Sequence, residues 1–181
     1  MSSDGTILRI AISGKSGCGN STVSRLVASQ LGLRVVNYTF KDLARDRGMG
    51  FEEIRLLAET DPQYDLTIDR KQVEFAREGP CVLGSRLAIW LLRDTAFTVY
   101  LRAPLEVRAG RIARRDGLSV AVAIAETRDR DRRDHERYRR LYGYDVDDFG
   151  FAALVVDADV LSQEEVAARI VDHAAEMAGG T

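Results

Sequence analysis

The sequence predicts an α/β domain in which a central parallel sheet of about five strands is covered by helices on both faces, a three-layer α/β/α arrangement. Short apolar runs with β-forming residues alternate with helical patterns along the whole chain. The 181 residues, 45% of them hydrophobic, suffice for one sizeable core. A glycine-rich loop joins the first run to the first helix. We therefore predict a single domain, 1–181, with ligands at the carboxyl ends of the strands.

Each predicted element follows from its apolar spacing and from the residues that end it. The first helix, for example, has Val23, Val27 and Leu31 on one face and stops at Gly32. Strands are predicted at 7–12, 33–37, 81–83, 97–101 and 154–156. Further helices are predicted from 40 to 48, 54 to 61, 66 to 79 and 87 to 92, from Pro104, from 119 to 142, and from Ser162, which forms a capping box with Glu165. Residues 177–181 are predicted to be a frayed end.

The glycine-rich loop reads GKSGCGNST and fits the pattern G-x-x-x-x-G-K-[ST], except that Asn20 stands where the pattern has lysine. Its glycines let backbone N–H groups approach an anion, and the following helix adds partial positive charge. The Ser21 hydroxyl suits a magnesium ion. We therefore predict a phosphate-binding loop made of Gly14, Lys15, Ser16, Gly17, Cys18, Gly19, Asn20, Ser21 and Thr22.

The missing lysine bears on turnover more than on binding, because that lysine normally follows the charge on the transferred phosphoryl group. Lys15, at the second position of the loop, is a candidate replacement. It would act from its own chain or from a second subunit. The alternative is a solvated lysine at the mouth of the loop. The sequence leaves both interpretations open.

Composition limits the partners and the compartment. The net charge is −2, which disfavours a nucleic-acid or anionic-membrane surface, and no apolar run approaches membrane-spanning length. Apart from three lysines the basic residues are arginines, a side chain that suits phosphate, although biased genomic composition explains most of the excess. Cys18 and Cys81 lack metal-ligand spacing, and no secretory segment is visible, so we expect free thiols in a reducing cytoplasm.

The segment between Ser119 and Tyr142 contains the run ETRDRDRRDHERYRRLYG, which is too charged for a core. Its i,i+4 acid–arginine pairs are typical of a solvated helix. Arg130, Asp134 and Arg137 nevertheless fall at i, i+4 and i+7 and share one helical face. That face suits a phosphate between two cations, with the carboxylate on a ribose hydroxyl. Spacing alone does not choose between the two interpretations.

Taken together, these residues resemble cytidylate kinases, in particular the compact archaeal type and its bacterial relatives, in the nucleoside monophosphate (NMP) kinase group of P-loop kinases. The similarity runs from about residue 7 to residue 171. The order and spacing of several motifs carry it, namely GKSGCGNST, FKDLARDRGM from Phe40, AETDPQYDLTIDRKQ from Ala58, VLGSRLAIW from Val82, LRAPLEVRAGRI from Leu101 and RYRRLYGYDVDD from Arg137.

The resemblance implies a three-layer P-loop NTPase fold with NMP-binding helices at about 39–79 and a short helical lid at about 108–140. It also implies site residues. The CMP phosphate would meet Lys41 and Arg86, the ribose would face Asp134, the cytosine edge would be read at Asp65, and the phosphate-transfer site would be lined by Arg130 and Arg137. Together with Lys15, those last two arginines are the predicted catalytic residues.

This chain departs from the family pattern at three places. Asn20 replaces the loop lysine, although the archaeal-type enzymes tolerate a small polar residue there. Lys41 replaces an arginine and so offers a point charge in place of a bidentate fork. Gly84 and Ser85 stand where an acidic residue and a glycine are usual, so a carboxylate near the magnesium shell is missing.

We therefore predict a cytoplasmic enzyme that uses ATP and Mg²⁺ to phosphorylate CMP or dCMP, with nucleotides as its partners and neither nucleic acid nor membrane. The shared face of Arg130, Asp134 and Arg137 favours an enzyme, because a module that binds only ATP needs no residues that bind a phosphoryl acceptor. One alternative is an ATP-binding regulatory module that has lost efficient turnover. A kinase of the same fold for another small acceptor is the second. The oligomeric state is left open.

Overall fold

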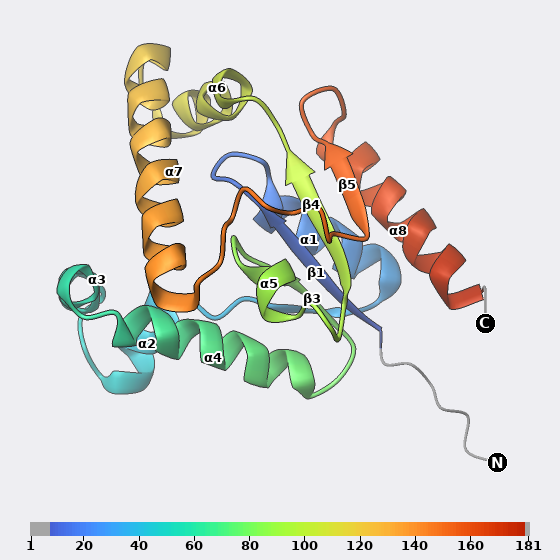
Figure 1. Cartoon of the computed structure of the whole chain (residues 1–181), viewed down its shortest axis with the longest axis horizontal. Coiled ribbons are helices and arrows are strands. Elements are labelled where there is room, and N and C mark those ends of the chain that lie inside the picture. Colours follow the sequence, from blue (N-terminus) through green and yellow to red (C-terminus); the bar gives the residue numbers. More distant parts are fainter. Residues whose placement is uncertain (1–7, 180–181) are drawn as a thin grey trace.

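The computed structural model describes residues 8–179 and contains a five-stranded, wholly parallel sheet between layers of helices (Figure 1). The predicted three-layer α/β/α fold is confirmed. The order of the strands across the sheet is β2-β3-β1-β4-β5. The strands are β1 (Arg9–Gly14), β2 (Arg34–Val36), β3 (Cys81–Gly84), β4 (Phe97–Arg102) and β5 (Leu154–Asp157).

Eight helices connect or flank these strands in the described part of the chain, and each predicted helix is present. They are α1 (Asn20–Leu31), α2 (Phe40–Arg47), α3 (Phe51–Thr60), α4 (Gln63–Arg77), α5 (Ala88–Leu91), α6 (Leu105–Asp116), α7 (Val120–Tyr142) and α8 (Gln163–Gly179). Among these described helices, none combines the length and the apolar character needed to cross a membrane.

The C-terminal end of the described chain differs from the sequence prediction. The frayed end is wrong for Met177–Gly179, because α8 continues through Gly179. Alanine, glutamate and methionine are good helix formers, and Ala174 is still buried at the preceding turn, so nothing stops the helix earlier. Residues 180–181, and Ile7 of the predicted first strand, lie outside the described residues.

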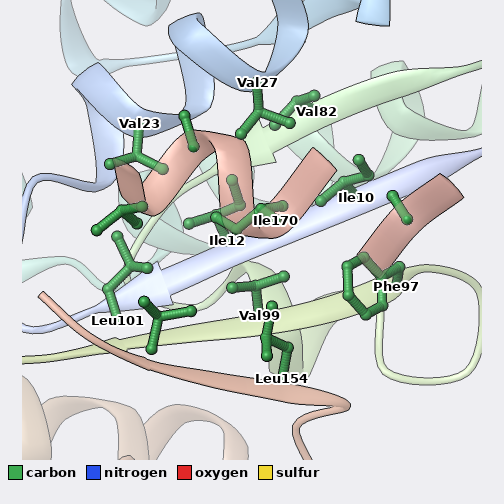
Figure 2. Packing of buried hydrophobic residues seen from close by; sticks show 14 of the residues in the cluster. Ile10, Ile12, Val23, Val27, Val82, Phe97, Val99, Leu101, Leu154 and Ile170 are labelled. Atoms are coloured by element: carbon green, nitrogen blue, oxygen red, sulfur yellow. The ribbon is translucent and has the colours of Figure 1, made fainter. Parts of the chain in front are cut away.

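The side chains of the central strands alternate between two cores, as the period of two requires. Ile10 and Ile12 face one layer, whereas Ala11 faces the other. On the first side they pack against α1 and α8, whose contributions include Val23, Val27 and Ile170 (Figure 2). The opposite core takes residues from α4, α5 and α7, among them Ala76, Ala88, Trp90 and Tyr138. Both faces of the sheet are therefore covered.

This topology sets where a ligand binds. After β1 the chain passes to α1 on one face, and after the neighbouring β3 it passes to α5 on the other face. A crevice forms at the carboxyl ends of such a pair of strands. The glycine-rich loop follows β1 and Arg86 follows β3, so the topology brings both to this crevice. Figure 1 shows α7 standing beside the sheet, between α6 at one end and α2 and α4 at the other.

Gly84, the last residue of β3, lies directly against α1. A Cβ atom built there would lie 2.1 Å from Ser24 Oγ and 2.8 Å from Ser24 Cβ. Ser24 is itself buried in the body of α1 and has no room to move away. This contact gives a physical reason for the missing acidic residue, because no side chain fits at this position beside Ser24.

We predict that Gly84→Ala lowers the free energy of unfolding by about 1–3 kcal/mol, because the added methyl overpacks the contact with Ser24. The matched control is Gly79→Ala, where an added Cβ meets nothing within 4 Å. Urea denaturation of both variants measures the difference. Equal midpoints for the two variants would contradict the prediction.

Candidate functional site

The glycine-rich loop has the backbone geometry of an anion cradle. Gly17 and Gly19 have φ values of 88° and 101°, in the left-handed region that favours glycine. A Cβ at Gly17 would lie 2.8 Å from the carbonyl oxygen of Arg108. Helix α1 begins directly after Gly19, so the free N–H groups of its first turn open onto the loop. The loop therefore takes the conformation predicted for phosphate binding.

Asn20 ties the two ends of the loop together. Its Nδ2 donates a hydrogen bond to the Gly14 carbonyl at 2.6 Å. The other amide atom, Oδ1, is buried and has no hydrogen-bond partner among the described residues. An asparagine side chain is too short to follow a migrating phosphoryl group, so this residue closes the loop instead of supplying the missing cation.

Lys15 is held at the mouth of the loop. Its Nζ lies 2.6 Å from Oδ1 of Asp147, which comes from the segment before β5. The hydrogen bond from Lys15 lowers the pKa of the Asp147 carboxyl. His135 Nδ1 lies 3.1 Å from the other carboxylate oxygen of Asp147. Lys15 is thus ion-paired rather than simply solvated, although it also lines the cleft described next.

The loop opens onto a cleft of about 740 Å³. A second cleft of about 540 Å³ lies beside it and is lined by Arg130 and Asp134 of α7. Asp65, Arg86 and Arg137 line both clefts and therefore stand at their junction. Volumes of this size suit nucleotide-sized ligands. The other residues that line the first cleft include Ser16, Gly17, Gly19, Asn20, Ser21, Thr22, Arg111 and Arg115.

An ion-pair network occupies this junction. Arg137 Nη1 lies 3.2 Å from Asp65 Oδ1, and Arg137 Nη2 lies 3.3 Å from Asp134 Oδ1. The second oxygen of Asp134 accepts a hydrogen bond from Arg86. Asp65 is 7% exposed, and burial raises its pKa. The structure thus brings together four of the predicted site residues, from α4, α7 and the turn after β3.

Arg130, Asp134 and Arg137 lie on one face of α7, as predicted. The N-terminal end of this face contacts the loop, and its C-terminal end contacts the junction network. Arg130 Nη1 donates to Ser16 Oγ at 3.3 Å, which joins α7 to the loop. Asp134 and Arg137 belong to the junction network. The opposite side of the helix carries exposed i,i+4 pairs such as Arg132–Glu136. The solvated-helix interpretation is therefore confirmed for that side, whereas phosphate binding by the other side stays a prediction.

Lys41 is a predicted site residue that the structure does not bring to the cleft. It is exposed at the start of α2, and its Nζ lies 5.7 Å from the centre of the Phe51 ring. It is not among the described residues that line either cleft.

Cys18 is buried under the loop, and burial raises the pKa of its thiol to about 11. Its contribution to the loop is therefore limited to the backbone.

Sequence reasoning missed the role of Arg108. Its side chain is buried and donates to the carbonyl oxygens of Ser16 and Ala103, both at 3.1 Å. It also pairs with Asp131 of α7 at 2.7 Å. The sequence feature that could have indicated this burial is the position of Arg108 one helical turn before Ile112, on the apolar face of α6. A charge at such a position needs buried partners.

Asp69 is a second, half-buried carboxylate of the first cleft that the sequence did not single out. Burial raises its pKa to about 6, and it accepts a hydrogen bond from the Tyr142 hydroxyl at the end of α7. Asp69 lies one helical turn after Asp65 on α4. The α4 wall of the cleft therefore carries two acidic groups with raised pKa values.

With this geometry established, comparison with known proteins gives the family. The sequence pattern of the "Cytidylate kinase-like family" matches residues 9–160. The chain belongs to this family. A protein named cytidylate kinase from Aeropyrum pernix is 42% identical over 166 residues, which cover 90% of this chain and 96% of that protein. "Cytidylate kinase 2" of Borrelia garinii is 38% identical and covers 92% of this chain and 96% of its own length.

Solved structures support the fold of the cytidylate kinase-like family member described here. Shikimate kinase from Acinetobacter baumannii, solved with shikimate, superposes with a TM-score of 0.63 at 18% identity and covers 96% of each chain. A deoxyadenosine kinase from M. mycoides superposes with a TM-score of 0.51 at 20% identity and covers 91% of this chain. At these identities the likeness concerns the fold, which is that of P-loop kinases. The family assignment makes the protein a nucleotide-using kinase.

Asp69 generates a prediction about pH. Its pKa rises from 3.8 in the unfolded chain to about 6 in the folded protein, so the folded protein retains this proton to higher pH. Folding is therefore disfavoured progressively as pH rises from about 4 to about 6, by up to about 3 kcal/mol. Asp69→Asn removes the titration but keeps an acceptor for Tyr142.

The measurement is urea denaturation of the ligand-free wild type and of Asp69→Asn at pH 4, 5, 6 and 7. We expect the stability of the variant relative to wild type to increase across this range. Other titrating groups are shared and cancel in the difference. Parallel stability curves for the two proteins would mean that Asp69 has an ordinary pKa.

Proposed function

We propose that the protein transfers the γ-phosphoryl group of ATP to CMP or dCMP and releases ADP with CDP or dCDP. One observation carries this proposal. The anion cradle after β1 and the arginines of the junction line one continuous cleft, in a chain whose family relatives are named cytidylate kinases. A donor phosphate at the loop and an acceptor phosphate at Arg86 and Arg137 would then lie side by side.

The donor end of the cleft fits a magnesium-bound triphosphate. The loop N–H groups and the start of α1 suit the β- and γ-phosphates. Ser21, exposed at the second residue of α1 and lining the cleft, presents a hard oxygen ligand of the kind that Mg²⁺ prefers. Magnesium supplies charge neutralisation on the phosphates when bound. No carboxylate follows β3, so Ser21 and the nucleotide would provide the non-water ligands.

At the acceptor end, the chemistry is alignment and neutralisation of charge. An oxygen of the CMP phosphate attacks the γ-phosphorus, and the bond from that phosphorus to the ADP oxygen breaks. The acceptor phosphate is already ionised, so no strong base is needed. Arg86 and Arg137 hold the acceptor phosphate, and Arg130 at the loop stabilises the migrating group. Asp134 faces the ribose.

The division into regions also belongs to this proposal. Residues at about 39–79 form the NMP-binding region, and most of α6 and most of α7 form the lid at about 108–140. Closure of the lid would exclude water, which otherwise hydrolyses ATP.

The two buried free thiols support a reducing cytoplasm as the compartment.

The family relatives do not favour the regulatory module, but one feature of the loop makes it the alternative to test. Asn20 is engaged by the Gly14 carbonyl, and Lys15 by Asp147, so the loop as it stands presents neither side chain as a free cation. Such a protein would bind ATP and turn over slowly. A kinase for another acceptor differs from the main proposal only in the identity of the acceptor.

A coupled assay with a panel of nucleoside monophosphates tests the function. We expect CMP and dCMP to exceed UMP by at least about tenfold in kcat/KM, because the Asp65 carboxylate suits an amine and not the carbonyl of uracil. Asp65→Asn should reduce this preference with the fold intact. If the protein binds ATP but phosphorylates none of these acceptors, whereas Asn20→Lys gains activity, the regulatory module is correct.

Lys15 generates a separate prediction. Lys15→Ala should lower turnover at least about tenfold, or about 1.4 kcal/mol, with a smaller effect on ATP affinity, because the lysine cation at the mouth of the loop, now paired with Asp147, is lost. Lys71→Ala is the control, since Lys71 pairs with Glu74 on the surface of α4. An unchanged rate in Lys15→Ala would transfer its role to the arginines of α6 and α7.

A further inference from the structure

Helix α4 presents three hydrogen-bond acceptors to the first cleft. Asp65, Asp69 and Gln72 fall at i, i+4 and i+7, so they share one helical face, and all three line the cleft. Tyr38 and Ile68, which are 6% and 7% exposed, line the same part of the wall. This wall combines apolar surface with polar groups that accept hydrogen bonds, which suits the flat face and polar edge of a nucleobase.

Two of these acceptors already have partners within the protein. Asp65 pairs with Arg137 at 3.2 Å. Asp69 accepts from the Tyr142 hydroxyl. Gln72 differs, because its Oε1 is buried and has no hydrogen-bond partner in the described part of the chain. A buried acceptor without a partner is costly to the folded protein, so such an atom points to a ligand.

The orientation of the Gln72 amide is fixed by the backbone. Its Nε2 donates to the Tyr38 carbonyl at 2.9 Å, in the segment between β2 and α2. A carbonyl oxygen only accepts, so the NH₂ group must face Tyr38 and the amide cannot be reversed. Gln72 is 6% exposed, so its side chain is also held by packing. Oε1 is therefore a preset acceptor.

We propose that Gln72 is a specificity-determining residue whose Oε1 accepts a hydrogen bond from the exocyclic amine of the acceptor base. This inference rests on the proposed function and names a second residue that reads the base. Cytosine carries an amine at the ring position where uracil carries a carbonyl. A uracil carbonyl would face Oε1 as acceptor against acceptor and leave both atoms unpaired.

The position of Gln72 along α4 agrees with this role. It lies seven residues beyond Asp65, a rise of about 10 Å along the helix. Asp65 stands at the junction with Arg86 and Arg137, where phosphate is expected. Gln72 lies farther from these cations, and a base extends away from its own phosphate. Gln72 is therefore placed to read the base beyond Asp65, whose carboxylate is shared with Arg137.

The test compares Gln72→Met with Gln63→Met, the same change at an exposed position of the same helix. The substrates are CMP, UMP and the 2-pyrimidinone ribonucleotide, which is CMP without its amine. Wild type and Gln63→Met should lose at least about tenfold in kcat/KM when the amine is removed from the substrate. In Gln72→Met this loss should shrink to about twofold or less, with the KM for ATP unchanged.

Gln72→Glu gives a rescue. A buried, protonated glutamate still donates to the Tyr38 carbonyl and keeps an acceptor at the position of Oε1, so the amine preference should return. If Gln72→Met does not fold, Gln72→Asn keeps the amide but withdraws it by one methylene, and the same loss of preference is expected. Thermal unfolding and ATP binding of each variant check the fold.

Three results would overturn the inference. In the first, a folded Gln72→Met loses activity equally with CMP and with the amine-free analogue, which marks a structural role. In the second, Gln72→Met keeps the full amine preference while Asp65→Asn abolishes it. In the third, Gln72→Glu fails to restore the preference. If the wild type instead fails to phosphorylate CMP at all, the proposed function fails before this comparison begins.

Discussion

The buried guanidinium of Arg108 is the interaction on which the site depends. It binds the loop through the Ser16 carbonyl, the end of β4 through Ala103, and α7 through Asp131. Because the backbone of Arg108 also fills the space beside Gly17, this one residue both holds the loop and requires a glycine at position 17. A buried charge with a full set of partners is stable, whereas removing one partner costs about 3–5 kcal/mol. The anion cradle is thus built against a fixed charge.

The other charges of the cleft are compensated within the protein. Arg86 and Arg137 pair with Asp65 and Asp134, and Lys15 pairs with Asp147. Such pairs hold long side chains in defined positions, so less conformational entropy remains to be lost when a phosphate binds. Any anion that binds here must in turn compete with carboxylates for the same donors. The site therefore holds its cations in preorganised positions.

Much of the fold could be predicted from sequence, because strand and helix periods were separated by clear glycine and proline signals. The α7 face was predictable for the same reason, since i, i+4 and i+7 spacing fixes direction on any helix. Contacts between distant segments were not predictable. The amide of Gln72 is oriented by a carbonyl 34 residues away, and the distance between Arg108 and Ser16 along the chain is 92 residues. Lys41, assigned by resemblance alone, lies over Phe51 because nothing in its own segment directs it inward.

Helix α7 contacts both halves of the site as one element of 23 residues, about 34 Å long. Arg130 touches the loop, and Arg137 and Tyr142 touch α4. Because a continuous helix moves as a rigid body, a displacement of α7 at the loop also changes its contacts with α4. Under the proposed function, a nucleotide that draws α7 toward itself would alter the affinity for the second nucleotide, and thermodynamic linkage would make the effect equal in both directions. The length and continuity of a single helix thus connect the two regions of the site mechanically.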